Sequence, residues 1–271
     1  MERETAISIG DVPHSINGEV LPEREWQLED DRFLMRADGD HYFFYRKGYG
    51  VTIERGAGAD PATEPLWCNG SIYAAVASIN GFLPIHASAV AINDEVYAFT
   101  GPSGAGKSTL ATALGQHGLP LFADDTLVLD LSEPDRVIAL PGHKRLKLAP
   151  DAIALTGARQ EEKVGRDIDK FYAVPPGGVV TAPMPLTTLF FLEVGNEPGI
   201  VPLGGAEKFF RFQDTHYTAE IYAGAQALGA GGAFDLFARL ASQVDMACFV
   251  RCRTRSTFDA DNELIAEYIK R

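Results

Sequence analysis

Apolar and polar residues alternate along an early part of the chain. The stretch 32–56, RFLMRADGDHYFFYRKGYGVTIERG, contains several short runs in which every second residue is apolar. Such alternation is typical of half-buried strands, and Asp38-Gly39 and the Gly48/Gly50 pair supply turn residues between the runs. The pattern predicts a small antiparallel β unit.

The alternating pattern of apolar and polar residues ends after this β unit. The stretch 57–66, AGADPATEPL, contains two prolines and predicts a linker. The next stretch, 69–80, NGSIYAAVASIN, predicts a helix capped at Asn69 or Ser71. We therefore expect a small N-terminal β-rich unit at 1–66 and a larger domain at 67–271.

Two apolar runs, LPIHASAVAI (83–92) and EVYAFT (95–100), flank the turn dipeptide Asn93-Asp94. This arrangement predicts an antiparallel hairpin, and pairing across it would set residues 86–88 beside residues 99–101. A parallel sheet would instead need a long crossover at this point. We expect an α/β fold with a mixed sheet.

The remaining elements follow from the same patterns. A helix is expected from Lys107 to about His117, followed by one strand over LPLFADDTLVLD (119–130). Further strands are expected at 137–142 and 186–194, and helices at 232–246 and 261–270.

Composition narrows the class of protein. The chain has 271 residues, of which 46% are hydrophobic and 23% charged, the mixture of a soluble globular protein. It has no apolar run of the roughly 18 residues that a membrane span needs, and its first residues lack the apolar core of a secretory signal. Three cysteines are too few and too irregular for a disulfide framework or a zinc site. We expect a cytoplasmic protein.

The net charge of −13 disfavours broad contact with nucleic acid or an anionic membrane. An acidic protein that binds a polyanion must gather its basic residues where the anion lies. Local clusters of Lys and Arg are therefore candidate binding residues.

The decapeptide GPSGAGKSTL (101–110) fits the P-loop pattern G-x4-G-K-S between an expected strand and an expected helix. Its backbone N–H groups and the helix N-terminus can hold phosphates, Lys107 can contact the β- and γ-phosphates, and Ser108 can bind Mg²⁺. The pattern predicts ATP binding by Gly101, Ser103, Gly104, Ala105, Gly106, Lys107, Ser108 and Thr109.

Asp124 and Asp125 end an apolar run just after the P-loop helix. One carboxylate can hold Mg²⁺ while the other accepts a proton from an attacking hydroxyl, although side chains on a strand point opposite ways unless the strand breaks there. His86 lies in an apolar run and is either a core residue or, through the hairpin, a neighbour of the P-loop.

The densest basic cluster lies in PGHKRLKLAPD, and its members are candidates for binding phosphate or a substrate anion: Lys144, Arg145 and Lys147. Strand alternation would send Arg145 and Lys147 one way and Lys144 the other. A second group is interleaved with acids and indicates a solvated loop: Lys163, Arg166 and Lys170. His216 has no evident partner in the sequence and is given no role.

These motifs together resemble one family. A histidine on a strand, a hairpin, G-x-S-G-x-G-K-S and an apolar strand ending in Ala-Asp-Asp, over residues 82–150, are similar to the catalytic domain of HPr kinase/phosphorylase. The resemblance implies a phosphoenolpyruvate carboxykinase-like P-loop core that uses ATP and Mg²⁺ to phosphorylate a protein serine. It implies Asp124 as catalytic acid/base, Asp125 and Ser108 at the metal, and His86 in the active site.

The chain also departs from that family. Thr109 stands where those kinases usually have Glu, their later acidic and arginine signature is not recognisable, and their regulatory domain has no counterpart here. The stretch PG-x-x-R-L-K-L looks more like the HPr kinase-related proteins of peptide-tailoring clusters, lasso-peptide kinases among them. The departures argue against HPr as the acceptor and against the reverse phosphorylase reaction.

The leading hypothesis is a serine kinase acting on a peptide or protein, with Lys107 and Asp124 as catalytic residues and Arg145, or a neighbouring lysine, steadying the transferred group. Two alternatives remain: a nucleotide-binding regulatory module without phosphotransfer, and a small-molecule kinase. The resemblance makes a homo-oligomer an option that no residue specifies. Peptide recognition by residues 1–80 is a hypothesis from their position alone.

Overall fold

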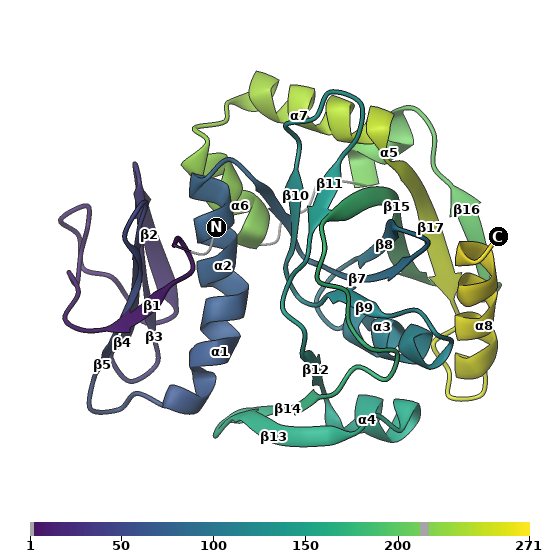
Figure 1. Cartoon of the computed structure of the whole chain (residues 1–271), viewed down its shortest axis with the longest axis horizontal. Coiled ribbons are helices and arrows are strands. Elements are labelled where there is room, and N and C mark those ends of the chain that lie inside the picture. Colours follow the sequence, from purple (N-terminus) through teal and green to yellow (C-terminus); the bar gives the residue numbers. More distant parts are fainter. Residues whose placement is uncertain (1–2, 212–216) are drawn as a thin grey trace.

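A computed structural model describes residues 3–211 and 217–271, so His216 lies outside the described part (Figure 1). It shows a mixed α/β fold with several sheets, as the sequence predicts. Across the two described ranges, no helix is both long enough and apolar enough to cross a bilayer.

The N-terminal sheet has five strands in the order β1-β5-β4-β3-β2. The predicted hairpins are confirmed, because β3 pairs with β4 and β4 with β5 in antiparallel fashion. Strands β1 and β2 were not predicted from the sequence, and β1 pairs with β5 in parallel. The strands are β1 (Ile7–Ile9), β2 (Glu25–Glu29), β3 (Arg32–Ala37), β4 (His41–Arg46) and β5 (Gly50–Arg55).

The predicted linker at 57–66 is partly helical, and the expected caps at Asn69 and Ser71 are wrong. A 3₁₀ turn begins at Pro61 and continues into α1 (Glu64–Trp67), a π-helical turn (Cys68–Ile72) and α2 (Tyr73–Ile79). The Asp60 side chain caps this start by accepting from the backbone nitrogen of Ala62 at 3.2 Å. Prolines suit the first turn of a helix, where their missing N–H is not needed.

Helix α2 packs against the N-terminal sheet and lies between it and the larger sheet (Figure 1). Ile72 and Val76 join Phe33 and Phe43 of the sheet in one buried cluster, which also takes in Ile221 from α6 (Tyr217–Ala225). Residues before and after position 66 thus pack in the same buried apolar cluster. The division of the chain at that residue stays a prediction.

The larger sheet has nine strands, with β6-β10-β11-β15-β8-β7-β9 as its main order and β17 joining β15 to β16. Its pairing is mixed, because β8 and β17 run parallel to β15 while most other pairs are antiparallel. The strands are β6 (Leu83–Ile85), β7 (Ala87–Ile92), β8 (Glu95–Thr100), β9 (Leu121–Ala123), β10 (Leu127–Asp130), β11 (Ile138–Leu140), β15 (Met184–Val194), β16 (Gly199–Pro202) and β17 (Asp245–Arg251).

The predicted hairpin is present as β7 and β8. Asn93 and Asp94 both have positive φ, as a two-residue turn of type I′ requires. Ala87 pairs with Thr100, which confirms the expected register. β8 therefore has an antiparallel neighbour, β7, on one side and a parallel neighbour, β15, on the other.

The helices cover the faces of this sheet. The predicted helices near 107, 232 and 261 are present, but the second one ends at Gln243 because strand β17 begins two residues later. Strand β17 and the small sheet β12-β14-β13 were not predicted from the sequence. The remaining elements are α3 (Lys107–Gln116), β12 (Leu146–Leu148), α4 (Pro150–Thr156), β13 (Gln160–Gly165), β14 (Ile168–Ala173), α5 (Ala206–Arg211), α7 (Ala230–Gln243) and α8 (Phe258–Ile269).

A buried histidine at the junction of sheet and helix makes stability depend on pH. His41 is fully buried, with Nε2 3.2 Å from a carboxylate oxygen of Glu64. Burial lowers the pKa of His41, and the nearby Glu64 only partly opposes this. The unfolded chain therefore takes up a proton at about pH 6.5, above the pH at which the folded protein does.

We expect the free energy of unfolding to fall more steeply below about pH 6.5 in the wild type than in a His41→Gln variant. Urea unfolding at pH 7.5, 6.5 and 5.5 measures both proteins. Equal pH slopes for the two proteins would contradict the assignment.

Candidate functional site

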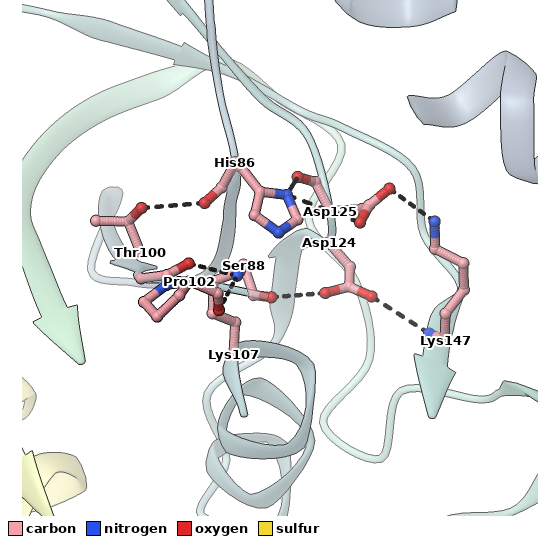
Figure 2. Close-up of polar contacts among 9 residues, drawn as sticks. His86, Ser88, Thr100, Pro102, Lys107, Asp124, Asp125 and Lys147 are labelled. Carbon is pink, nitrogen blue, oxygen red and sulfur yellow. Dashed lines mark hydrogen bonds and ion pairs between the residues drawn. The ribbon is translucent and has the colours of Figure 1, made fainter. Parts of the chain in front are cut away.

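The glycine-rich segment forms the loop between β8 and α3. Gly104 and Gly106 have positive φ, a conformation that lets the chain curl before the helix begins. The Lys107 side chain is buried, and its Nζ donates to the carbonyls of Gly101 at 2.8 Å and Pro102 at 3.2 Å (Figure 2). The ammonium group is thereby held at the beginning of the loop.

Two facing strands are interrupted at the same place. The predicted strand 83–92 breaks at His86, and the predicted strand 119–130 breaks at Asp124–Thr126, so both single-strand predictions are wrong. The ladders continue on both sides, with Ile85 opposite Leu127 and Ala89 opposite Ala123. The residues between these pairs face one another.

The break in the second strand has a local cause. Thr126 donates its backbone N–H to the carbonyl of Asp124 at 2.9 Å, which closes a tight turn. Asp125 has a φ of 72°, a left-handed conformation that Asp tolerates better than most residues. Gly142 packs on this turn so closely that a Cβ atom there would lie 2.9 Å from Cβ of Ala123.

The carboxylate of Asp124 is buried, with 2% of the residue exposed, and both of its oxygens accept hydrogen bonds (Figure 2). Oδ1 accepts from the hydroxyl of Ser88 at 2.6 Å, and Oδ2 accepts from the backbone nitrogen of Lys147 at 3.2 Å. Ser88 itself pairs with Phe99 on β8. It therefore links Asp124 to the strand that precedes the glycine-rich loop.

Asp125 is more accessible, with 27% of its side chain exposed. Its Oδ2 lies 2.7 Å from Nζ of Lys147. His86 places Nδ1 2.9 Å from the backbone oxygen of Asp125 and 3.9 Å from its carboxylate, so Nδ1 carries the proton of this hydrogen bond. Burial alone would raise the pKa of Asp125, but Lys147 and then His86 outweigh it, and the pKa lies below its ordinary value.

The side chains of the three basic candidates do not alternate in direction as the sequence predicts. Lys144 and Lys147 both turn towards the segment 122–125, since Lys144 donates to the carbonyl of Phe122. Arg145 turns away and pairs with two glutamates of β13, while stacking on Tyr172 at 4.0 Å. The alternation fails because β12 begins only at Leu146. Burial lowers the pKa of Lys144 to about 8.

Arg251, at the end of β17, was not among the residues predicted from the sequence. Its side chain is buried, and Nη2 donates to the carbonyl of Ala105 in the glycine-rich loop at 2.7 Å. Burial lowers its pKa to about 10. The signal was present in FVRCRTRS, where three arginines follow an apolar run, but the run was not recognised as a strand.

The predicted loop residues and the predicted aspartate and histidine residues thus lie at the ends of neighbouring strands. The loop and Lys107 follow β8, Asp124 and Asp125 follow β9, and His86 precedes β7. Ser108 and Thr109 lie in the first turn of α3. Arg145 is not among the residues that contact the two aspartates.

Carboxylates alone do not form a metal centre here. Within residues 3–211 and 217–271, no three side chains of His, Cys, Asp or Glu come together in a way that could hold a metal ion. A metal at this site would need further ligands from hydroxyl groups, water or a phosphate, which is how Mg²⁺ is commonly bound.

Comparison with known proteins gives little guidance. No protein-family model matches the chain, and no curated protein matches it. Among solved structures, it is similar to the HPr(Ser) kinase/phosphatase from Coxiella burnetii, with 12% identity and a TM-score of 0.36, over 69% of this chain and 97% of that chain. This is a distant likeness, and it does not bear on activity or on individual site residues.

The Ser88–Asp124 hydrogen bond is open to a direct test. Ser88→Ala removes a donor to a buried carboxylate, and we expect the free energy of unfolding to fall by about 2 kcal/mol. Ser78→Ala is the matched control, because Ser78 is equally buried but its hydroxyl has no hydrogen-bond partner among residues 3–211 and 217–271. Urea unfolding compares the two variants, and equal effects would show that the Ser88 hydrogen bond adds nothing.

Proposed function

We propose that the chain is an ATP- and Mg²⁺-dependent kinase that transfers the γ-phosphoryl group to a serine hydroxyl on a peptide or protein. One observation carries the proposal. The glycine-rich loop with Lys107 and the Asp124–Asp125 pair converge at one end of the sheet, and the hydroxyl of Ser88 links them. A phosphate cradle beside paired carboxylates is the arrangement that phosphoryl transfer needs.

The loop supplies the phosphate contacts in this proposal. Its backbone N–H groups and the N-terminus of the ten-residue helix α3 favour an anion. Lys107 would exchange its two carbonyl partners for phosphate oxygens, which are stronger acceptors because they are charged. The proposed nucleotide contacts are Gly101, Ser103, Gly104, Ala105, Gly106, Lys107, Ser108 and Thr109.

The residues present suit Mg²⁺. Ser108 and Asp125 would hold it with phosphate oxygens and water, a donor set of hard oxygens that fits this ion. Bound there, Mg²⁺ would neutralise charge on the transferred phosphoryl group. The lowered pKa and partial exposure of Asp125 favour it as the ligand. The competing contact is the ammonium group of Lys147.

Asp124 is the proposed general base. The serine hydroxyl would pass its proton to Asp124 while its oxygen bonds to the γ-phosphorus, and the bond to the β–γ bridging oxygen would break to release ADP. Asp125 is the more exposed carboxylate and pairs with Lys147, which suits the metal role and leaves the role of base to Asp124. The hydrogen bond from Ser88 would orient the carboxylate.

Lys147 contacts Asp125, and Arg251 contacts the glycine-rich loop. They support charge stabilisation better than Arg145, whose guanidinium group already pairs with two glutamates. His86 would hold the turn through its hydrogen bond to the backbone of Asp125.

A cavity of about 380 Å³ supports an acceptor of peptide size. It lies between the edge strand β1, the helical segment at Asn69 and the loop at Gly142 and His143. Gly142 packs on the turn at Asp124–Thr126, and Gly70, next to Asn69, approaches the carboxylate of Asp125. An extended peptide entering beside β1 would thus reach the two aspartates from the N-terminal unit.

One observation favours the second candidate, a nucleotide-binding regulatory module without phosphotransfer. Both oxygens of Asp124 already accept hydrogen bonds within the protein. A kinase must release at least one of them when the acceptor binds.

The test uses γ-labelled ATP with Mg²⁺, and with a lysate, purified HPr and synthetic serine peptides as acceptors. The expected result is a labelled protein or peptide that is absent with Lys107→Ala. ATP binding with only slow hydrolysis would support the regulatory module. Label on a small metabolite would support a small-molecule kinase.

Asp124→Asn should separate binding from transfer. We expect phosphate transfer to fall by about 10²–10⁴-fold, because the base is lost, while the Kd for ATP changes by less than about threefold. Calorimetric ATP binding and the labelling assay measure the two effects. Parallel loss of both would contradict the role of Asp124.

Asp125→Asn tests the metal role, and Asn tolerates the same left-handed backbone. We expect the Mg²⁺ concentration for half-maximal transfer to rise by about tenfold or more. Asp130→Asn, at the far end of β10, is the control and should leave it unchanged. An unchanged Mg²⁺ requirement in Asp125→Asn would assign the metal to another residue.

A further inference from the structure

Strand β1 forms an open edge of the N-terminal sheet. Among residues 3–211 and 217–271, β5 is the only strand that pairs with it. The carbonyl of Ala6 and the N–H of Gly10 bond to β5 at 2.8 and 3.1 Å. Because successive residues of a strand turn their backbone groups to opposite sides, Ile7 and Ile9 direct their N–H and C=O groups away from β5. These groups form the edge that a further strand can join.

The side chains of this edge are apolar. Ile7 and Ile9 are 56% and 58% exposed. They lie on the same face of β1, since the hydroxyl of Ser8 between them meets the hydroxyl of Thr52 on the other face at 3.2 Å. Edge strands are commonly protected by lysine, proline or a bulge, and Ile-Ser-Ile has none of these. Such an edge suits a partner that pairs with it.

The cavity of about 380 Å³ beside β1 adds a pocket to this edge. Four of its lining residues are aliphatic and come from β1, β5, the π-helical turn and α2: Ile7, Val51, Ile72 and Val76. An aliphatic lining suits an apolar side chain. Ile7 belongs to both the edge and the pocket, so a strand added to β1 would have a side chain next to the pocket.

The pocket borders the proposed transfer site. Gly142, which lines it, packs on the turn at Asp124–Thr126. On the helical side, a Cβ atom at Gly70 would lie 3.5 Å from Oδ2 of Asp125. A segment bound in the pocket thus lies beside the turn that carries both aspartates.

We propose that the acceptor adds to β1 as a further strand, with an apolar side chain in the pocket and its serine beside Asp124. The inference rests on the proposed function and names its substrate class. That class is a segment that is extended around the serine and carries a large apolar residue at a fixed number of positions from it. Main-chain hydrogen bonds to Ile7 and Ile9 would give affinity, and the pocket would give specificity.

The continuity of edge, pocket and aspartates favours the acceptor over a second copy of the chain as the occupant. Pairing between two copies would use the edge alone and would leave the pocket without a role. An acceptor segment uses all three features.

The probes are fluorescent twelve-residue peptides of lysine and glutamine with one fixed serine and one leucine that is moved along the peptide. Fluorescence anisotropy without nucleotide measures their binding to the full chain. We expect one or two leucine positions to bind about tenfold or more tightly than the same peptide with alanine there, because a buried leucine side chain is lost.

Backbone methylation of the best peptide tests strand addition on the wild-type protein. Each amide nitrogen is methylated in turn, which removes one N–H donor. We expect the loss of affinity to alternate, with about threefold to tenfold weaker binding at every second position, because alternate amides of an added strand face β1. Losses that do not alternate would overturn the inference.

Ile9→Pro tests the same contact from the side of the protein. It removes an N–H group that points away from β5, and proline is tolerated at such edge positions. We expect it to weaken the best peptide by about threefold to tenfold. Ile9→Thr is the conservative counterpart, because it keeps the N–H group, and it should recover most of the binding. Equal binding by Ile9→Pro and the wild type would count against the inference.

Two further outcomes would also overturn it. One is that no peptide of the series binds. The other is a dimer of the wild type that Ile9→Pro dissociates in analytical ultracentrifugation, since the edge would then hold a second copy.

The assay with γ-labelled ATP separates these outcomes from failure of the proposed function. If the peptides bind as expected but none is labelled, the binding site stands and its role for an acceptor falls with the kinase. If a lysate protein is labelled in a manner that needs Lys107, and Ile9→Pro labels it equally well, the kinase stands and strand addition falls.

Discussion

The hydrogen bond between Ser88 and the buried carboxylate of Asp124 joins the two halves of the candidate site. A buried carboxylate is costly unless it is well paired, and here a hydroxyl and a backbone N–H share that task. The first partner comes from β7 and the second from β12. The carboxylate is therefore fixed by strands on two sides, and it ties the hairpin before the glycine-rich loop to the turn at Asp124–Thr126.

That turn is also constrained from outside. Asp125 adopts a left-handed backbone, and Gly142 packs on the turn with no room for a side chain. Lys147 pairs with the side chain of Asp125 while its own backbone nitrogen reaches Asp124. Unusual backbone held by several independent contacts is common where side chains must be presented at a set angle.

Local patterns in the sequence predicted local structure well. The hairpin around Asn93-Asp94 and the helix from Lys107 follow from turn chemistry and a short motif, and both are present. The helix that starts at Pro61 was missed because a proline near a loop resembles a proline in a first helical turn. The Asp60-Pro61 pair is the sequence signal of a helix start, and the structure shows Asp60 acting as the cap.

The candidate site was predictable only as far as its residues are adjacent in sequence. The loop and the aspartate pair were identified, but the strand breaks that let both aspartates face the same region were not. The orientations of Lys144, Arg145 and Lys147 depend on where β12 begins. Arg251 reaches the loop because β17 pairs in parallel with β15, a long-range contact that no local pattern encodes.

The buried cluster beneath the N-terminal sheet has a consequence for synthesis of the chain. Phe33 and Phe43 share this cluster with Ile221, which is added much later. At about 5–20 residues per second, the ribosome needs many seconds to add the residues between them. During that time the nascent sheet holds an apolar surface that its own segment cannot fully cover. The first strands to emerge are therefore among the last to become fully packed, and the nascent chain should need protection from aggregation until α6 has emerged.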